Sequence, residues 1–564
     1  MPKFDPLLAY LDGQPTARWN APDEIGTPAS ITYSFTRAVP AYDDPATHPG
    51  FTPLSGSMQA AVRTALDSWA DVANLTFTEV PDSGGGGEIR IGSHEMGYGG
   101  YSYYPAFEGG EPTDLAGDIY LGRYPENAHT APGQYGLETI VHEIGHAIGL
   151  KHPFEGSHTL PASEEDLGHT VMAYDPPKNS NVVSVTGTAA DYRYVSQPLY
   201  PSGPMLYDIA AAQFLYGANM AHATGNDSYA WATHARFFET IWDAGGTDRI
   251  DTSNQTLDSV IDLRDGHYSS IAMRDSVAEK RLEIPAFATE APTPAYDGHN
   301  NLAIAFGAVI ENATGGSGAD TITGNAVANS LDGGAGADSL DGGAGADTLI
   351  GRDGNDSLAG GDDSAIDRLL GGNGNDRLDG ASGHGEADWL AGGAGDDLYV
   401  IDSAADMVTE VAGQGTDTVH LRMPGGRYSL PAHVENLVLE GTAQTGGGNE
   451  LANVITGNAA GNWLLGGAGA DTLDGGAGAD ILFGGEGADL FVVARGSGGD
   501  RIGDFAPGAD EIRLSGFGVS SFTQLLGRTS DGASGAVIDF GGGDSLSLAG
   551  IAKSALAAGD FVFA

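Results

Sequence analysis

The chain of 564 residues is too long for a single hydrophobic core and should divide into two or more domains. Acidic residues outnumber basic ones by 76 to 25, and the net charge of -51 disfavours nucleic acid and anionic membranes as partners while favouring multivalent cations. Cysteine is absent, which excludes disulfides, thiolate metal sites and cysteine nucleophiles, and no stretch is long and apolar enough to span a bilayer.

The first third of the chain predicts an α+β domain. Residues 1–30 form a loop-like extension, either a removable leader or a frayed terminus, and contain no basic segment followed by a long apolar core, so we expect no N-terminal signal peptide. Apolar residues at helical spacing predict an amphipathic helix at 57–73. Short strands are expected at 75–80, 88–91, 100–104 and 117–121, a second helix from about 137 and a third at 206–216. This order predicts a mixed sheet packed with long helices.

The second helix carries the sequence HEIGHAIGLKH, which begins at His142. Residues four apart lie on one helix face, so His142 and His146 can bind one ion with Glu143 beside it. Gly149 permits the left-handed turn that ends a helix, and the chain can then return His152 as a third ligand. Three neutral imidazoles leave a tetrahedral zinc with an open position for water, which is typical of a catalytic site. The pattern predicts a zinc hydrolase with Glu143 as the general base.

Beyond a domain boundary near 217–225, the chain contains a nine-residue repeat of the form Gly-Gly-x-Gly-x-Asp-x-apolar-x. The glycines permit a tight turn, the aspartate supplies a charged oxygen, and the apolar residue points inward. Stacked turns predict an all-β parallel β-roll, and its rows of carboxylates suit calcium because calcium accepts six to eight oxygens. The candidate calcium ligands in the repeats are Gly316, Gly318, Asp320, Gly334, Gly336, Asp338, Gly343, Gly345, Asp347, Gly354, Asp356, Asp367, Gly372, Gly374, Asp376, Gly393, Gly395, Asp397, Gly467, Gly469, Asp471, Gly476, Gly478, Asp480, Gly485, Gly487 and Asp489.

Several copies of the repeat differ from this pattern. Asn329, Asn453 and Asn462 stand where the aspartate belongs, so we expect these copies to start each stack and to bind calcium weakly or not at all. The copies that end near Asp367 and Asp388 are lengthened and should bulge. The predicted organisation is an extension at 1–30, a domain with the zinc motif at 31–222, a strand-rich start of the second domain at 223–314, a first repeat block at 315–400, a strand-rich insert at 401–447, a second block at 448–492 and a C-terminal β cap at 493–564.

With both the zinc motif and the nonapeptide repeats, the chain resembles the serralysin family of secreted metzincin proteases. The metal motif matches the pattern His-Glu-x-x-His-x-x-Gly-x-x-His of that family residue by residue. The resemblance implies that His142, His146 and His152 bind zinc and that Met172 forms the Met-turn beneath it without being a ligand. It also implies that Tyr174 ligates zinc at rest, swings away when substrate binds, and then supports catalysis.

The same resemblance implies further sites. Residues Tyr101, Ser102 and Tyr103 are similar to the edge strand against which such enzymes align an extended peptide. A stretch similar to the start of the family's roll implies calcium ligands at Gly225, Asp243, Gly245 and Asp248. The C-terminal sequence DFVFA, residues 560–564, is similar to the uncleaved signal that directs the family through a type I exporter. The resemblance therefore implies an extracellular protein, with a zinc metalloprotease domain at 31–222 and a secretion signal within the β cap at 493–564.

The predicted function is a secreted endopeptidase that cuts internal peptide bonds of protein and peptide substrates, holds one zinc and several calcium ions, and folds its roll when calcium binds. We expect a monomer, in which the second repeat block either extends the roll or tethers the enzyme to a cell surface. The alternative is a repeat-rich surface or matrix binding protein with a non-catalytic zinc site. The carboxylate of Glu143 beside an open site of three histidines favours the enzyme, because a structural zinc needs neither.

Overall fold

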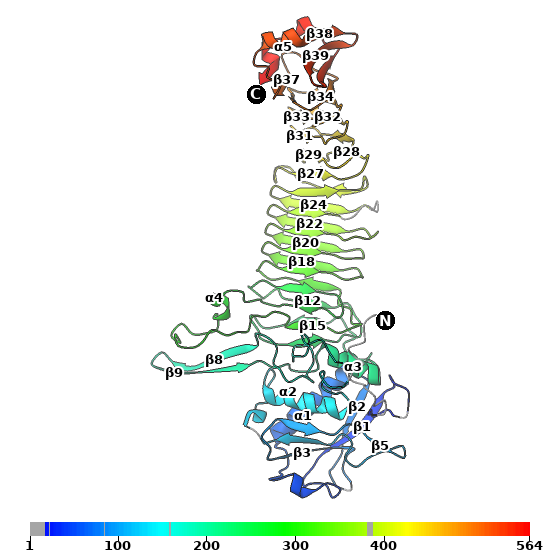
Figure 1. Ribbon diagram of the computed structural model, residues 1–564, viewed down its shortest axis with the longest axis vertical. Helices are drawn as coiled ribbons and strands as arrows, with labels where there is room; N and C mark the ends of the chain where they lie inside the picture. Colours follow the sequence, from blue (N-terminus) through cyan, green and yellow to red (C-terminus); the bar gives the residue numbers. More distant parts are fainter. Residues whose placement is uncertain (1–16, 22, 84, 124, 157–158, 381–386) are drawn as a thin grey trace. The chain divides into compact units, whose positions relative to one another are not determined.

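The computed structural model describes residues 17–564 apart from 22, 84, 124, 157–158 and 381–386 (Figure 1). The chain divides into two compact units, Met1–Asn312 and Ala313–Ala564. A mixed sheet with helices comes first along the chain, and parallel strands wound as a β-roll follow, so the predicted fold class is confirmed. No helix among the described residues is long and apolar enough to cross a membrane.

A five-stranded sheet and three helices build the first part of unit 1. The strand order is β2-β1-β3-β7-β4, and β4 alone runs antiparallel to its neighbour at the edge of this sheet. The elements are β1 (Ala29–Phe35), α1 (Gly56–Val72), β2 (Leu75–Glu79), β3 (Ile89–His94), β4 (Gly100–Ser102), β7 (Ile119–Gly122), α2 (Tyr135–Ala147) and α3 (Leu206–Tyr216), with short strands β5 (Phe107–Glu108) and β6 (Glu111–Pro112). All three predicted helices and all four predicted strands are present.

Helix α1 supports the helix that carries the metal motif. Ser55 caps its first turn by accepting a hydrogen bond from Met58 N at 3.3 Å. Its buried face includes Leu66 and Trp69, and the indole Nε1 of Trp69 donates to Val141 O at 3.2 Å. Burying a large apolar side chain contributes about 1.5–3 kcal/mol, so this contact fixes α2 against α1 in both position and rotation.

Part of the predicted N-terminal extension packs on α2, the helix that carries the metal motif. Residues 1–16 lie outside the described residues, but Trp19 is buried and its Nε1 donates to Ala147 O at 2.7 Å. Tyr216 OH accepts from Trp19 N at 3.2 Å and donates to Ile148 O at 2.6 Å. Two carbonyls at the end of α2 thereby gain donors, one from Trp19 of the extension and one from Tyr216 of α3.

The remainder of unit 1 is rich in short strands. Its elements are the antiparallel hairpin of β8 (Asn181–Thr188) and β9 (Asp191–Pro198), the parallel pair of β10 (Ser228–Ala230) and β12 (Arg249–Asp251), the three-stranded sheet of β11 (Glu239–Ile241), β15 (Leu302–Ile304) and β14 (Tyr268–Ser269), the strand β13 (Val260–Asp262) and the short helix α4 (Val277–Lys280). The hairpin was not predicted. Its Val183 packs against Ile284, Ala288 and Ala291 in a small separate core.

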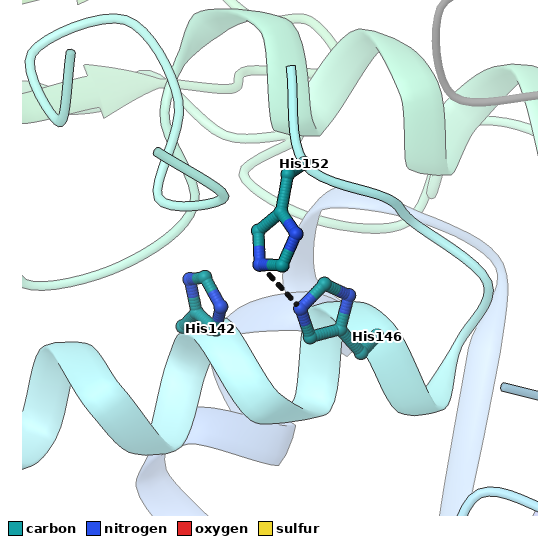
Figure 2. Close-up of side chains that lie close together, drawn as sticks. All are labelled: His142, His146 and His152. Atoms are coloured by element: carbon teal, nitrogen blue, oxygen red, sulfur yellow. Dashed lines mark hydrogen bonds between the residues drawn. The ribbon is translucent and has the colours of Figure 1, made fainter. Parts of the chain in front are cut away.

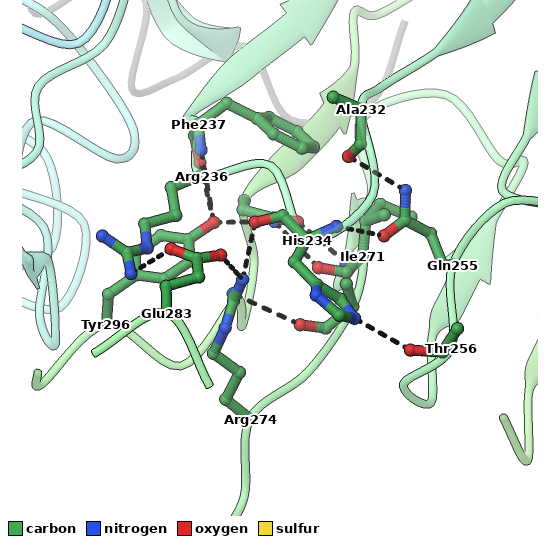
Figure 3. A network of polar contacts seen from close by, with 12 residues as sticks. Ala232, His234, Arg236, Phe237, Gln255, Thr256, Ile271, Arg274, Glu283 and Tyr296 are labelled. Carbon is green, nitrogen blue, oxygen red and sulfur yellow. Dashed lines mark hydrogen bonds and ion pairs between the residues drawn. The ribbon is translucent and has the colours of Figure 1, made fainter. Parts of the chain in front are cut away.

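A buried arginine connects the loops of this region (Figure 3). Arg274 is 1% exposed, and its Nη2 donates to His234 O at 2.7 Å and lies 3.4 Å from Glu283 Oε1. The same glutamate pairs with Arg236, and the guanidinium of Arg274 lies over the ring of Tyr296 at 5.3 Å. Segments far apart in the sequence are thus joined through one planar cation.

We expect Arg274→Met to destabilise unit 1 by about 2–3 kcal/mol, because it leaves the His234 carbonyl without its charged donor. Thermal unfolding followed by circular dichroism measures this loss. Arg193→Met is the matched control, since Arg193 is exposed on β9. Equal melting temperatures for the two variants would contradict the assigned role.

Unit 2 is a solenoid built mainly of parallel strands. One sheet comprises β18 (Ser330–Ala335), β20 (Thr348–Asp353), β22 (Arg368–Asn373), β24 (Trp389–Ala394) and β26 (Met407–Val408), after β16 (Asn312–Thr314) at the start of the unit. A second comprises β17 (Thr321–Thr323), β19 (Ser339–Asp341), β21 (Ser357–Ala359), β23 (Arg377–Asp379), β25 (Leu398–Ile401), β27 (Thr418–Leu421), β29 (Asn436–Leu439), β31 (Val454–Thr456), β33 (Thr472–Asp474), β35 (Leu490–Ala494), β37 (Glu511–Ser515) and β41 (Phe561–Phe563). A third comprises β28 (Arg427–Ser429), β30 (Thr445–Gly447), β32 (Trp463–Ala468), β34 (Ile481–Glu486), β36 (Gly499–Ile502), β40 (Asp544–Ala549), β39 (Gly535–Gly541) and β38 (Thr529–Gly532), with helix α5 (Phe522–Arg528) before β38. Only the pairs β38–β39 and β39–β40 among the described strands of this unit are antiparallel.

The apolar position of each repeat forms the interior of the solenoid. Leu331, Leu349 and Leu369 lie in register on adjacent strands and are fully buried. The segment predicted as an insert also stacks in parallel on its neighbours, because β27 pairs in parallel with β25 and with β29. Residues 401–447 therefore continue the stack of strands between the two repeat blocks.

Candidate active site and metal centres

Three histidines converge at the end of helix α2 (Figure 2). His142 and His146 lie one turn apart on the helix with ring centroids 4.7 Å apart, and His152 returns above them at 5.3 and 4.5 Å. Gly149 makes the return possible, since its φ of +105° lies in the left-handed region and a Cβ there would meet Ala17 O at 2.2 Å. One nitrogen from each ring lies within 4.8 Å of the others, so the predicted ligands are brought together.

The outer nitrogen of each ring is held by an oxygen. His142 Nδ1 donates to Val171 O at 2.7 Å, and His146 Nδ1 donates to Leu150 O at 2.7 Å. His152 Nδ1 lies 2.9 Å from Glu155 Oε1. A carbonyl can only accept, so Nδ1 carries the proton and Nε2 presents a lone pair. His146 Nε2 and His152 Nε2 lie 3.1 Å apart, so both nitrogens can face one shared cation.

Burial favours the neutral form of the two helical imidazoles, His142 and His146. It lowers the pKa of His142 to about 4, and it lowers the pKa of His146 well below its usual value, with neighbouring His142 and His152 adding to the effect. Both residues are 7% exposed. Neutral imidazole is the form that binds zinc, so the residues present fit that metal.

Glu143 lies between the histidines and the edge strand β4. Ser102 Oγ lies 2.8 Å from Glu143 O and 3.1 Å from Glu143 Oε2, and it can donate to either. Burial raises the pKa of Glu143 to about 8, which the hydrogen bond from Ser102 opposes. A carboxylate with a raised proton affinity, fixed beside three metal-binding nitrogens, is suited to accept a proton.

The Met-turn lies directly beneath the helix. Met172 is fully buried, and a Cβ on Gly145 would meet its Sδ at 2.4 Å, so the glycine between the two helical histidines makes room for the methionine. The turn is held by Asp208, whose oxygens accept from Thr170 Oγ1 at 2.6 Å and Val171 N at 2.7 Å. Asp208 thereby fixes the carbonyl that orients His142.

An open cleft of about 730 Å³ runs over the histidines and β4. Tyr174 lines it, is 63% exposed, and places its ring 4.6 Å from that of His152. Tyr101 and Ser102 also line the cleft, whereas Tyr103 is not among the lining residues. Tyr104 lines the cleft instead of Tyr103, and its ring lies 5.4 Å from that of His146.

A separate acidic group lies at the start of the strand-rich part of unit 1. Carboxylate oxygens of Asp227, Asp243 and Asp248 lie within 4.8 Å of one another, and Asp248 Oδ2 is buried without a hydrogen-bond partner among the described residues. A Cβ on Gly246 would meet Gly225 O at 1.6 Å, so the loops that contain Gly225 and Gly245 approach closely. The predicted calcium ligands Asp243 and Asp248 are together, and Asp227 joins them with its side chain.

The aspartates of the repeats form a ladder along the solenoid. Asp338 N donates to Asp356 Oδ1 at 2.8 Å, and Asp356 N donates to Asp376 Oδ1 at 2.8 Å, so one oxygen of each carboxylate holds the backbone of the preceding turn. The other oxygen is buried without a hydrogen-bond partner, within the part of the chain described, in Asp338, Asp347, Asp356, Asp376, Asp397, Asp471, Asp480 and Asp489. Burial raises the pKa to about 7 in Asp338, Asp347, Asp376 and Asp397.

The asparagine copies of the repeat lack this free oxygen. Asn453 Nδ2 donates to Val434 O at 3.2 Å and to Glu435 O at 3.0 Å, and Asn462 Nδ2 donates to Ala443 O at 3.0 Å. The amide supplies its own donor where the carboxylate leaves an acceptor unpaired. This difference supports the prediction that these copies bind calcium weakly or not at all.

Comparison with known proteins agrees with both motifs. Residues 52–163 match the matrixin family, and residues 314–349, 332–366, 350–386, 382–398 and 456–491 match the RTX calcium-binding nonapeptide repeat. The chain is 35% identical over 328 residues to Serralysin C of Dickeya chrysanthemi, covering 54% of this chain and 60% of that protein. It is 30% identical over 358 residues to Serralysin of Proteus mirabilis, covering 57% and 65%, and 32% identical over 328 residues to Metalloprotease AprA of Pseudomonas entomophila, covering 54% and 61%.

The predicted resemblance to the serralysin family is confirmed. The chain spans about three fifths of the length of these curated relatives. A matrixin region followed by RTX repeats is the arrangement that the zinc motif and the nine-residue period predict. These relatives support a metalloprotease, with zinc expected from the matrixin region and calcium from the repeats.

Sequence reasoning missed the residues that orient the zinc ligands. The acceptors for His142 and His146 are main-chain carbonyls, which leave no trace in side-chain patterns. Glu155, three residues after His152, and Asp208, an acidic residue in the apolar helix α3, were the available signals. A buried acid in an apolar helix needs a partner, and that rule would have directed attention to Asp208.

We expect Gly145→Ala to lower zinc affinity by about 10–100-fold, because the added methyl group displaces Met172 and tilts the helix that carries two ligands. Competition with a zinc-binding dye measures the affinity. Gly527→Ala is the control, since a Cβ at this helical glycine meets nothing within 4 Å. An unchanged zinc affinity in Gly145→Ala would show that the packing of Met172 does not support the site.

Proposed function

We propose that the chain is a secreted zinc-dependent endopeptidase of the serralysin type that hydrolyses internal peptide bonds. The observation that carries the proposal is the convergence of three imidazoles on one point, with the buried carboxylate of Glu143 beside it in an open cleft. A closed structural site would need a fourth protein ligand and no cleft. The similarity to proteins named serralysin and metalloprotease supports the same assignment.

Three groups of this chain perform the chemistry. A zinc ion held by His142, His146 and His152 would supply Lewis acidity that lowers the pKa of water and polarises a peptide carbonyl. Glu143 takes the proton of the attacking water and passes it to the leaving amine, which its burial favours. Tyr174, exposed above the histidines, donates a hydrogen bond to the oxygen that gains negative charge.

The edge strand aligns the substrate. Among the described strands β4 pairs only with β7, so its other edge can pair with an extended peptide. The hydroxyl of Tyr101 lies 2.8 Å from His48 Nε2, and this contact holds the Tyr101 side chain in place. Ser102 connects this strand to Glu143, so the scissile bond of a peptide on β4 would lie beside the base.

Glu143→Gln should lower cleavage of casein by about 10²–10⁴-fold while zinc content stays the same, because the amide cannot accept the proton of water. Elemental analysis and an assay of casein fragments measure the two quantities. Glu108→Gln, at an exposed position on β5, is the control. Equal cleavage by both variants would exclude Glu143 as the base, and a zinc-loaded wild type without proteolysis would favour the alternative surface-binding protein.

Calcium-dependent folding of the roll is the second part of the proposal. The unpaired buried oxygens of the ladder oppose folding unless cations neutralise them. β41 lies within the second sheet beside β37, so the predicted export signal at 560–564 is part of the folded solenoid. Passage through a type I exporter would then precede folding, and calcium outside the cell would complete it.

Removal of calcium should unfold the roll of the full-length chain. Each site occupied at 100 times its dissociation constant contributes about 2.7 kcal/mol, so the loss of several sites exceeds the stability of a typical domain. Circular dichroism in chelator and after calcium addition follows the transition. Magnesium is the control, because it demands near-ideal octahedral geometry and should not restore the fold. A spectrum unchanged by chelator would refute this part of the proposal.

A further inference from the structure

The segment between the two repeat blocks contributes carboxylates to one buried cluster. Oxygens of Asp397, Glu410 and Asp417 lie within 4.8 Å of one another. Asp397 belongs to the last clear repeat of the first block, whereas Glu410 and Asp417 lie outside the ranges that match the repeat family. The cluster therefore joins a regular turn to the segment 401–447.

Asp417 continues the ladder of repeats. Asp376 N donates to Asp397 Oδ1 at 2.8 Å, and Asp397 N donates in the same way to Asp417 Oδ1 at 2.9 Å. The turns also stack, since Gly395 N donates to Gln414 O at 2.7 Å. Residues 413–419 read GQGTDTV, a degenerate copy of the repeat that retains two glycines, the aspartate and the inward apolar residue.

Glu410 has no equivalent in a regular turn. β26 pairs with β24 through Leu390 and Val408, so Glu410 lies level with Gly392, the first glycine of the neighbouring copy. A side chain here is possible because the segment departs from the repeat. Its carboxylate accepts from Tyr399 OH and from Gly393 N at 3.4 Å, which directs it toward Asp397.

The cluster has buried charge without a protein cation. Asp397, Glu410 and Asp417 are 2%, 8% and 2% exposed. Asp397 Oδ2 is buried with no hydrogen-bond partner among the described residues, and no described arginine, lysine or histidine forms an ion pair with the three carboxylates. Three ionised groups this close are unstable alone, so a bound cation or shared protons must compensate them.

We propose that Asp397, Glu410 and Asp417 bind a calcium ion that locks segment 401–447 onto the end of the first repeat block. The donors are oxygens only, and the glutamate adds a charged ligand that regular turns lack. A hard cation with flexible coordination suits this set better than magnesium, which requires regular octahedral geometry, or zinc, which favours nitrogen and sulfur. The inference rests on the proposed calcium binding of the roll and not on proteolysis.

Glu410→Gln in the full-length chain tests the site, because it removes one charge and keeps an oxygen that can accept from Tyr399. Equilibrium dialysis should show one calcium ion fewer per chain than in Glu450→Gln, a matched change at an exposed position. The slope of folding free energy against the logarithm of calcium concentration reports the number of ions bound on folding, and it should fall by the amount that corresponds to one ion. Asp417→Asn, which keeps the acceptor for Asp397 N, should give the same loss if Glu410→Gln folds poorly.

Two results would overturn the inference. One is an unchanged number of ions and an unchanged slope in both variants, which would show that the cluster shares protons. The other is a lower melting temperature at every calcium concentration with an unchanged slope, which would show a packing role only. A wild type that binds no calcium would refute calcium-dependent folding as well, so the failures of the two proposals are distinguishable.

Discussion

Buried acceptor atoms that face one another constrain both units of this protein. In unit 1, His146 Nε2 and His152 Nε2 lie 3.1 Å apart while their outer nitrogens are committed to Leu150 O and Glu155. In unit 2, ladder aspartates such as Asp338 and Asp356 hold the backbone of the preceding turn with one oxygen, while their other oxygen has no hydrogen-bond partner among the described residues. Such atoms are costly to bury alone. Both arrangements become stable when a cation occupies the space between the acceptors.

The geometry at the zinc site originates in turns that lie outside the histidine motif. Gly149 sets the return of the chain, and that return places Leu150 O against His146. Asp208 fixes Val171 N, so the carbonyl of the same residue reaches His142. The three imidazoles are therefore oriented before metal binds, which lowers the conformational entropy that binding must overcome.

The sequence predicted what depends on periodicity and side-chain chemistry. Spacing alone indicated α1, α2, the convergence of His142, His146 and His152, and the apolar interior of the roll, because a helix face and a solenoid turn repeat at fixed intervals. It could not indicate that the side chain of Asp227 lies beside Asp243 and Asp248, because this depends on how two loops meet. It could not indicate Glu410 either, because the place of this residue depends on the register of β24 and β26. The hairpin of β8 and β9 also escaped prediction, since its apolar residues pack on a segment distant in the sequence and not on the main core of the domain.

The asparagine copies make the start of the second repeat block different from the aspartate copies that follow it. Asn453 and Asn462 satisfy their side chains with carbonyls of the preceding segment, so these turns need no cation to be buried. In a solenoid each turn contacts only its neighbours, and order spreads from turns that are already stable. If the roll folds with calcium as proposed, the second block would have a calcium-independent start, and its aspartates would add turns as cations bind. A calcium ion at Glu410 would also stabilise this start, because it would order the segment 401–447, whose Glu435 carbonyl accepts from Asn453.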